Sequence, residues 1–221
     1  MISLKYCKID MIRAKSMWWF CILFPLLSLL IYRSDHFQNM PMGSIVYSLF
    51  GALVFATIPM RTEQAYESGF IEMLPGKKGM QSAGHFWFGL FSCFFFYILA
   101  LVFLSLAHLI SPGMFVWQGN FKEIGGLHLV MLGCVLLLIG LECFFLSSFR
   151  FKSLQVMAII SMLPAFLFFF GSNYIMENHR DFFGILIKNV QGISPVLIFV
   201  FSLLFYGFLA KLCVWIIKKR G

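Results

Sequence analysis

The chain has 221 residues, of which 61% are hydrophobic and only 12% are charged. Soluble domains usually carry about 25% charged residues, so this composition excludes a separate soluble domain and predicts one integral membrane domain. The formal net charge is +8, but the basic residues stand between apolar runs rather than in one patch. That distribution argues against nucleic-acid binding and predicts a signal for membrane orientation.

The first predicted element is the N-terminal segment MISLKYCKIDMIRAK, residues 1–15. In a helix, Ile2, Tyr6 and Ile9 would share one face, but Arg13 continues that face, so the amphipathic pattern is weak. We expect a short interfacial helix on the cytoplasmic surface. The apolar run that follows lacks a small-residue cleavage site, which favours an uncleaved first span over a signal peptide.

Six apolar runs are long enough, or nearly so, to cross the hydrocarbon core, which takes about 20 residues of helix. Lipid leaves unpaired backbone groups unsatisfied, so the runs predict an all-α membrane domain with six transmembrane helices. They cover approximately residues 16–33, 43–60, 85–110, 126–149, 153–172 and 194–217. The segment DFFGILIKNV, residues 181–190, is apolar enough to lie in the headgroup region or to dip back into the protein as a re-entrant segment before the last span.

The distribution of lysine and arginine predicts the orientation. An even number of spans places both termini on one side, and that side holds 13 of the 17 Lys and Arg residues. The other side holds Arg33, Lys122, Arg180 and Lys188. Because cytoplasmic loops are enriched in basic residues, we expect a multi-pass protein with both termini in the cytoplasm.

The connection between the second and third spans is about 24 residues long, more than a simple turn needs. It contains the stretch ESGFIEMLPGKKGMQSAGH, residues 67–85. Apolar side chains recur there at helical spacing and are bordered by Glu63 and Glu67. The apolar stripe consists of Tyr66, Phe70, Met73 and Leu74. We therefore predict a short amphipathic helix over 61–74 on the cytoplasmic side.

The predicted helix ends at Pro75-Gly76, and Lys77 and Lys78 follow its C-terminus, where the helix dipole favours cations. The Gly-Lys-Lys-Gly sequence is not a phosphate-binding loop. Six residues lie between Gly69 and Gly76 instead of four, a lysine replaces the required hydroxyl, and a helix precedes the loop. No zinc-type cysteine pair or histidine motif occurs either, so we expect no catalytic, cofactor-binding or metal site in this chain.

Glu142 is the ionisable residue that falls deepest within a predicted span. It precedes Arg150 by eight residues, which corresponds to about 12 Å of helical rise. Ionisable groups at such depth usually face the bundle interior and have a partner. Two interpretations stay open: a residue of a translocation or coupling path, or a structural hydrogen bond between helices.

Two stretches resemble the membrane subunit of a type-2 ABC exporter, a family of small six-helix permeases. In that family a sequence of the type acid, then Leu-Pro-x-[Lys/Arg]-[Lys/Arg], follows the second span, as Glu63, Glu67 and Leu74-Pro75-Gly76-Lys77-Lys78 do here. The segment KIDMIRAKSMWW is similar to the family's lead into its first span. Gly76 departs from the pattern, since valine or another small apolar residue is more usual there.

The resemblance implies that two such subunits pair, as a homodimer or with a sister chain, and dock on a separate ATPase that binds ATP and Mg²⁺. The short cytoplasmic helix would couple the ATPase to the spans. The implied coupling residues are Glu63, Tyr66, Glu67, Phe70, Met73, Leu74, Pro75, Lys77 and Lys78. The family exports hydrophobic or amphipathic substrates. Its compact, Phe- and Lys-rich members are most like transporters of antimicrobial peptides in bacterial cell membranes, including self-immunity systems.

Two other functions are compatible with the sequence. An intramembrane enzyme would use Glu142 or a histidine cluster as its site. A membrane immunity or scaffold protein would bind a peptide without transporting it. The transport interpretation predicts an ATPase partner, whereas neither alternative does.

Overall fold

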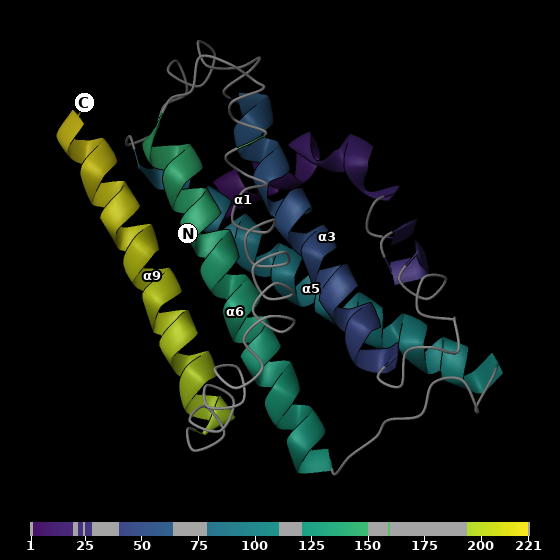
Figure 1. The fold of residues 1–221 in the computed structure, drawn as a ribbon. Helices are drawn as coiled ribbons and strands as arrows, with labels where there is room; N and C mark the ends of the chain where they lie inside the picture. Colours follow the sequence, from purple (N-terminus) through teal and green to yellow (C-terminus); the bar gives the residue numbers. More distant parts are fainter. Residues whose placement is uncertain are drawn as a thin grey trace.

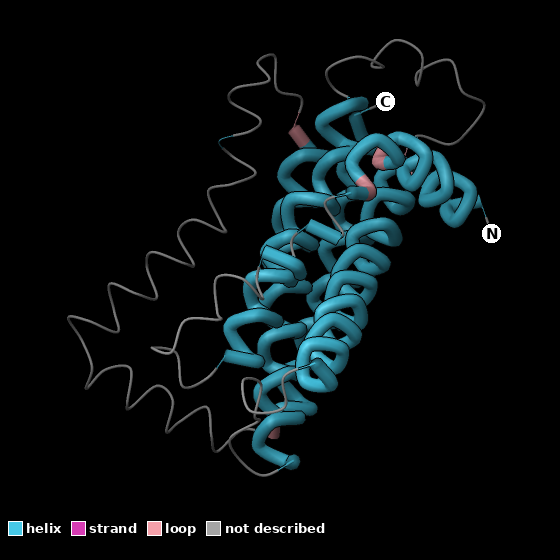
Figure 2. Tube along the Cα trace, turned by 90° about the vertical axis from the view of Figure 1, so that its right-hand side faces the viewer, coloured by secondary structure: helices cyan, strands magenta, loops and turns pink. Residues whose placement is uncertain are grey.

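The computed structural model describes residues 2–19, 22–23, 25–27, 40–63, 79–110, 121–149, 159 and 194–220. Within these ranges every regular element is a helix (Figure 1). Four long helices lie roughly along one another, and a short helix lies across their ends (Figure 2). In chain order the elements are α1 (Ile2–Arg13), η1 (Lys15–Met17), α3 (Met40–Thr62), α5 (Met80–Ile110), α6 (Phe121–Ser148) and α9 (Pro195–Arg220).

Three of the long helices carry apolar stretches that are long enough to cross a membrane. These are Met80–Ile110 in α5, Gly125–Ser148 in α6 and Pro195–Lys219 in α9. Helix α3 contains a shorter apolar stretch, Ser48–Thr62. The predicted all-α membrane character is therefore confirmed in the described part of the chain.

Three of the predicted spans, 85–110, 126–149 and 194–217, fall on these helices, and 43–60 falls within α3. The total of six spans stays a prediction, because half or more of each of the other predicted elements lies outside the described residues. Those elements are the spans at 16–33 and 153–172, the coupling helix beyond Glu63 and the re-entrant segment at 181–190.

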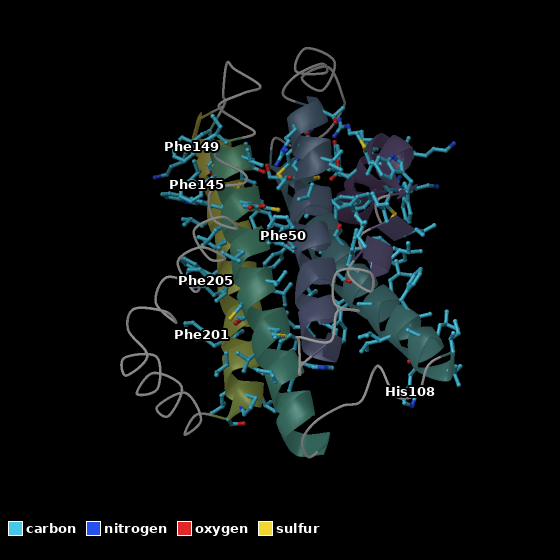
Figure 3. The ribbon with its side chains drawn as sticks, turned by 45° about the vertical axis from the view of Figure 1, so that its right-hand side comes forward. Phe50, His108, Phe145, Phe149, Phe201 and Phe205 are labelled. Carbon is cyan, nitrogen blue, oxygen red and sulfur yellow. The ribbon has the colours of Figure 1, made fainter. Side chains whose placement is uncertain are left out.

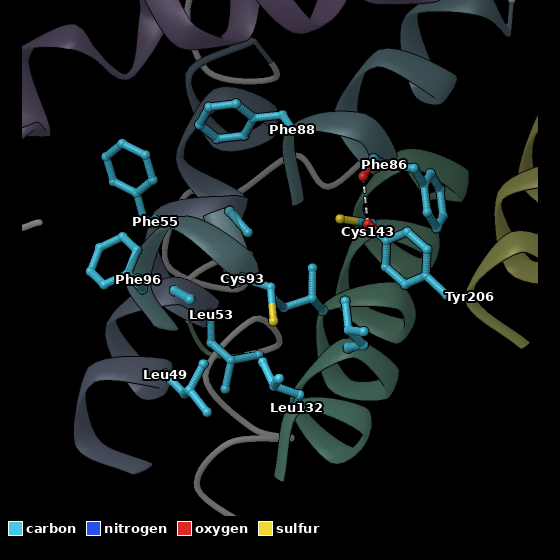
Figure 4. Packing of buried hydrophobic residues seen from close by; sticks show 14 of the residues in the cluster. Leu49, Leu53, Phe55, Phe86, Phe88, Cys93, Phe96, Leu132, Cys143 and Tyr206 are labelled. Carbon is cyan, nitrogen blue, oxygen red and sulfur yellow. Dashed lines mark hydrogen bonds between the residues drawn. The ribbon is translucent and has the colours of Figure 1, made fainter. Parts of the chain in front are cut away.

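Aromatic side chains fill the core between α3 and α5. Phe55 on α3 packs against Phe88 and Phe96 on α5, with ring centroids 5.5 and 5.7 Å apart (Figure 4). All three rings are buried. Because lipid tails are as apolar as these side chains, close packing rather than escape from water holds such helices together.

Tyr206 joins α9 to α5. Its hydroxyl donates a hydrogen bond to the carbonyl oxygen of Phe86 (Figure 4). The tyrosine fits because Gly89 and Gly140 leave room: a Cβ at either position would lie 2.8 Å from an atom of Tyr206. These glycines allow α9 to approach both α5 and α6 closely.

The outer side of α6 and α9 carries exposed aromatic rings. Phe145 on α6, Phe149 just after α6 and Phe201 on α9 are exposed on this side (Figure 3). A soluble protein rarely exposes so large an apolar surface, whereas lipid tails cover it without cost. This side of the bundle is therefore suited to contact lipid.

Helix α1 lies across the ends of α3 and α5 and packs through a face that the sequence pattern did not indicate. Cys7, Asp10 and Ala14 are buried, whereas Tyr6 and Ile9 are only partly buried. An acid on the buried face interrupts the hydrophobic periodicity, which explains why the amphipathic pattern is weak. The packing of α1 therefore depends on more than apolar burial.

We predict that Gly84→Ala weakens the docking of α1 on α5. A Cβ at Gly84 would lie 2.5 Å from Tyr6 Cβ and 3.1 Å from the Tyr6 backbone carbon, so the two helices would have to separate. Such overpacking destabilises a fold by about 1–3 kcal/mol. Thermal unfolding of the detergent-purified protein measures the loss.

Gly207→Ala is the matched control, because a Cβ there meets nothing within 4 Å. It should leave the unfolding temperature unchanged or raise it slightly, since alanine favours helix over glycine. Equal unfolding temperatures for the two variants would contradict the close packing of α1 on α5.

Candidate functional site

Four charged or titratable side chains meet where α1, the end of α3 and the start of α5 come together. Asp10 and Arg13 belong to α1, Glu63 directly follows α3, and His85 lies in the second turn of α5. Their side chains are 1%, 7%, 19% and 5% exposed, in that order. Charges buried to this degree are stable only when they are paired and hydrogen-bonded.

The four side chains form a closed ring in which acid and base alternate. His85 Nδ1 lies 2.8 Å from Asp10 Oδ2, and His85 Nε2 lies 2.9 Å from Glu63 Oε2. Arg13 Nη1 donates to Asp10 Oδ1 at 3.1 Å and to Glu63 Oε2 at 3.3 Å. Each carboxylate therefore contacts both the histidine and the arginine, and three separate segments are joined at one point.

The geometry indicates that His85 carries a positive charge. Each of its ring nitrogens faces a carboxylate oxygen, and an ionised carboxylate can only accept hydrogen bonds. A neutral imidazole has a single N–H, so both contacts are hydrogen bonds only in the imidazolium form. The ring then holds two negative and two positive charges and is neutral as a whole.

The environment of Glu63 favours its ionised form. Burial by itself raises the pKa of this carboxyl group. The hydrogen bond from His85, the charge of His85 and the charge of Arg13 outweigh burial, so the pKa lies below its ordinary value. The carboxylate is thus a fixed member of the ring at neutral pH.

The ring stands at the beginning of the segment that the sequence predicts to couple the protein to an ATPase. Residues 64–78 lie outside the described residues, but Glu63 and Gly79 flank them. Gly79 has φ +103°, a conformation that favours glycine, and packs against Val214 of α9. One end of the segment is therefore held by α1 and α5, and its other end by α9.

Of the nine coupling residues that the sequence predicts, Glu63 is the one that the structure describes. The others are Tyr66, Glu67, Phe70, Met73, Leu74, Pro75, Lys77 and Lys78, which lie outside the described residues. The other three ring members, Asp10, Arg13 and His85, carry no sequence pattern that marks them as a site. Asp10 falls in the family-like N-terminal stretch, but no spacing rule connects it to a histidine 75 residues later.

Glu142 is buried in α6, with 2% of its surface exposed. Neither of its carboxyl oxygens accepts a hydrogen bond from any described residue. Arg61, in the last turn of α3, interacts with it electrostatically. The interpretation of Glu142 as an interhelical hydrogen bond therefore finds no partner in the described helices, and its role in transport stays a prediction.

In the described ranges no three His, Cys, Asp or Glu side chains are grouped so as to hold a metal ion. In the ring, the guanidinium of Arg13 contacts both carboxylates, and Arg13 and His85 together balance their negative charge.

Comparisons of the chain with profiles of protein families, with curated proteins and with solved structures give no match.

We predict that His85→Gln destabilises the fold strongly, by about 3–5 kcal/mol, because it leaves two buried carboxylates with one arginine. Adding Asp10→Asn should recover part of that loss, since Glu63 and Arg13 then form a neutral pair. Unfolding of the wild type, both single variants and the double variant measures the coupling between the two positions.

His108→Gln is the control for this cycle, because His108 is exposed at the far end of α5 (Figure 3). It should unfold like the wild type. Strictly additive effects of His85→Gln and Asp10→Asn would contradict the ring, since independent sites do not couple.

The lowered pKa of Glu63 predicts a dependence of stability on pH. A carboxyl whose folded pKa is depressed contributes stability above its ordinary pKa, here 4.5, and loses it as pH falls through the depressed value. The free energy of unfolding should therefore fall below pH 4.5 less steeply in Glu63→Gln than in the wild type. Denaturant titrations between about pH 6 and pH 3 measure both slopes. Identical slopes would show that Glu63 does not ionise as a member of the ring.

Proposed function

We propose that this chain is the transmembrane subunit of an ATP-binding-cassette exporter. It forms, with a second such subunit, a pathway for a hydrophobic or amphipathic substrate, of which a peptide is the class we favour. A separate ATPase that binds ATP and Mg²⁺ drives it. The proposal places the chain in a bacterial cell membrane with both termini in the cytoplasm.

The position of the charged ring carries this proposal. A membrane subunit that has no ATPase of its own must receive work from a partner through a cytoplasmic segment. That segment can act only if it is joined firmly to the spans. The residues that flank 64–78 support such a role, because Glu63 before them belongs to the ring and Gly79 after them lies against Val214 of α9.

The arrangement of helix ends supports the predicted orientation. The start of α5 and the end of α3 meet at the ring, and α1 and the end of α9 lie at the same end of the bundle (Figure 2). Lys211, Lys218 and Lys219 in the last part of α9 are exposed there, and Lys219 lies over the ring of Trp215. Basic and aromatic residues together at one end of the spans are typical of the cytoplasmic interface.

The ring would also transmit a displacement of residues 64–78 to the helices. Displacement of residues 64–78 would act on Glu63, which contacts Arg13 on α1 and His85 on α5. Buried ion pairs resist separation, because removing one partner leaves an uncompensated charge in a medium that solvates it poorly. A push on the segment would therefore move these helices together instead of being absorbed by a soft contact.

We predict that Phe70→Ala with Leu74→Ala uncouples ATP hydrolysis from transport. The two residues lie on the predicted apolar stripe, and their removal takes away the surface that would enter a groove on the ATPase. The chain is co-expressed with the ATPase, reconstituted in vesicles and assayed for both hydrolysis and substrate movement. Transport per ATP should fall at least about tenfold, which corresponds to the loss of one good interface contact.

Ser68→Ala with Glu72→Ala is the matched control, because these residues lie on the opposite side of the predicted helix. This control should transport like the wild type. Wild-type coupling in the Phe70/Leu74 variant would contradict the assignment of the coupling helix. Failure of any ATPase to co-purify would instead contradict the transporter, and peptide binding without ATP-dependent movement would then favour the immunity or scaffold function.

A further inference from the structure

The outer face of α1 carries a row of lysines. Lys5, Lys8, Ile12 and Lys15 follow one another at intervals of three and four residues, which places them on one side of a helix. All four are exposed, in contrast to the buried face through which α1 packs on the bundle. The helix therefore has one buried face and one exposed basic face, a division that the spacing of its apolar residues does not predict.

No carboxylate within residues 2–19 balances the positive charge of this face. Asp10 is the acid within residues 2–19, and it is turned inward, where Arg13 and His85 contact it. The three lysines are not in an ion pair with any described residue. Three ammonium groups are therefore exposed and are not paired with an acid of the described part of the chain.

Exposed apolar side chains accompany the lysines. Ile12 is 62% exposed and Trp19 is 52% exposed, and Met17 is exposed as well. An acidic soluble protein would satisfy the lysines but would gain less from these apolar groups. A membrane surface satisfies both, because lysines reach the headgroups while tryptophan and aliphatic side chains enter the boundary with the acyl chains.

The position of α1 fits this partner. The helix crosses the ends of α3 and α5 instead of running alongside them, so it lies at the level where the apolar span of α5 begins (Figure 1). That level is where the headgroups of a surrounding bilayer lie. In a membrane that surrounds these spans, the outer face of α1 would lie beside the charged headgroup layer and not beside the hydrocarbon core.

We propose that the outer face of α1 is a binding site for anionic lipid headgroups. The ammonium groups of Lys5, Lys8 and Lys15 contact the lipid phosphates, and Ile12 and Trp19 enter the adjoining acyl boundary. This site does not depend on the transport function proposed above, since it requires only that the chain spans a membrane.

Photocrosslinking tests the site in the full-length protein. The protein is reconstituted in nanodiscs that contain phosphatidylglycerol or phosphatidylcholine with the same photoreactive acyl chain, and crosslinks within residues 2–19 are located by mass spectrometry. Phosphatidylglycerol should label this segment more than phosphatidylcholine. Lys5→Gln, Lys8→Gln and Lys15→Gln together should reduce that preference by roughly 10- to 100-fold, since each basic residue near the surface contributes separately.

The matched control replaces the same three lysines by arginine, which keeps the charge and should keep the preference. The glutamine variant should also unfold at the wild-type temperature, because the lysines are exposed and outside the buried ring. Equal labelling by the two lipids in the wild type, or an undiminished preference in the glutamine variant, would overturn the proposal. So would full competition by inorganic phosphate, which would identify a site for the free anion and not for a lipid.

Discussion

The arrangement of this protein depends on the ring formed by Asp10, His85, Glu63 and Arg13. Cys7 on α1 and Ala14 just after it are buried in the apolar core, and Met11 packs against that core, while Asp10 is buried as a charged group. The ring supplies directional contacts to two other segments at once. Because each carboxylate contacts both cations, displacement of one member leaves a buried charge unbalanced. The ring therefore fixes the relative positions of α1, α3 and α5.

The effect of the ring extends to α9 through the backbone of α5. His85 is a ring member, and the carbonyl group of the next residue, Phe86, accepts the hydrogen bond of Tyr206 on α9. Gly89 lies one turn further along and leaves the space that the tyrosine needs. The first two turns of α5 thus join α1 and α3 on one side to α9 on the other. A rigid junction of this kind is what a membrane subunit driven from outside would require.

The sequence predicted the features that the bilayer itself imposes and missed those that depend on contacts between distant residues. Helices α5, α6 and α9 were predictable because a span must be apolar over its whole length. The packing face of α1 was not, because a buried acid replaces the apolar residue that periodicity needs. Glu63 was identified from its neighbours in sequence, but its partners lie 50 residues before it, at Arg13, and on the next helix, at His85. No local pattern connects these positions, since their pairing exists only in the folded bundle.

Under the two proposals, α1 lies between the buried charges of the ring and the charged headgroups of the membrane surface. Its inner face is bound by buried partners at fixed positions, whereas its outer lysines would be bound by mobile lipids at the membrane surface. Salt screens exposed charges over about 10 Å at 0.1 M but acts much less on buried pairs. Ionic strength would therefore weaken the lipid contacts while leaving the ring intact. The surface charge of the membrane would then influence α1, and the ring would transmit that influence to Glu63, next to the segment 64–78 on which the proposed ATPase would act.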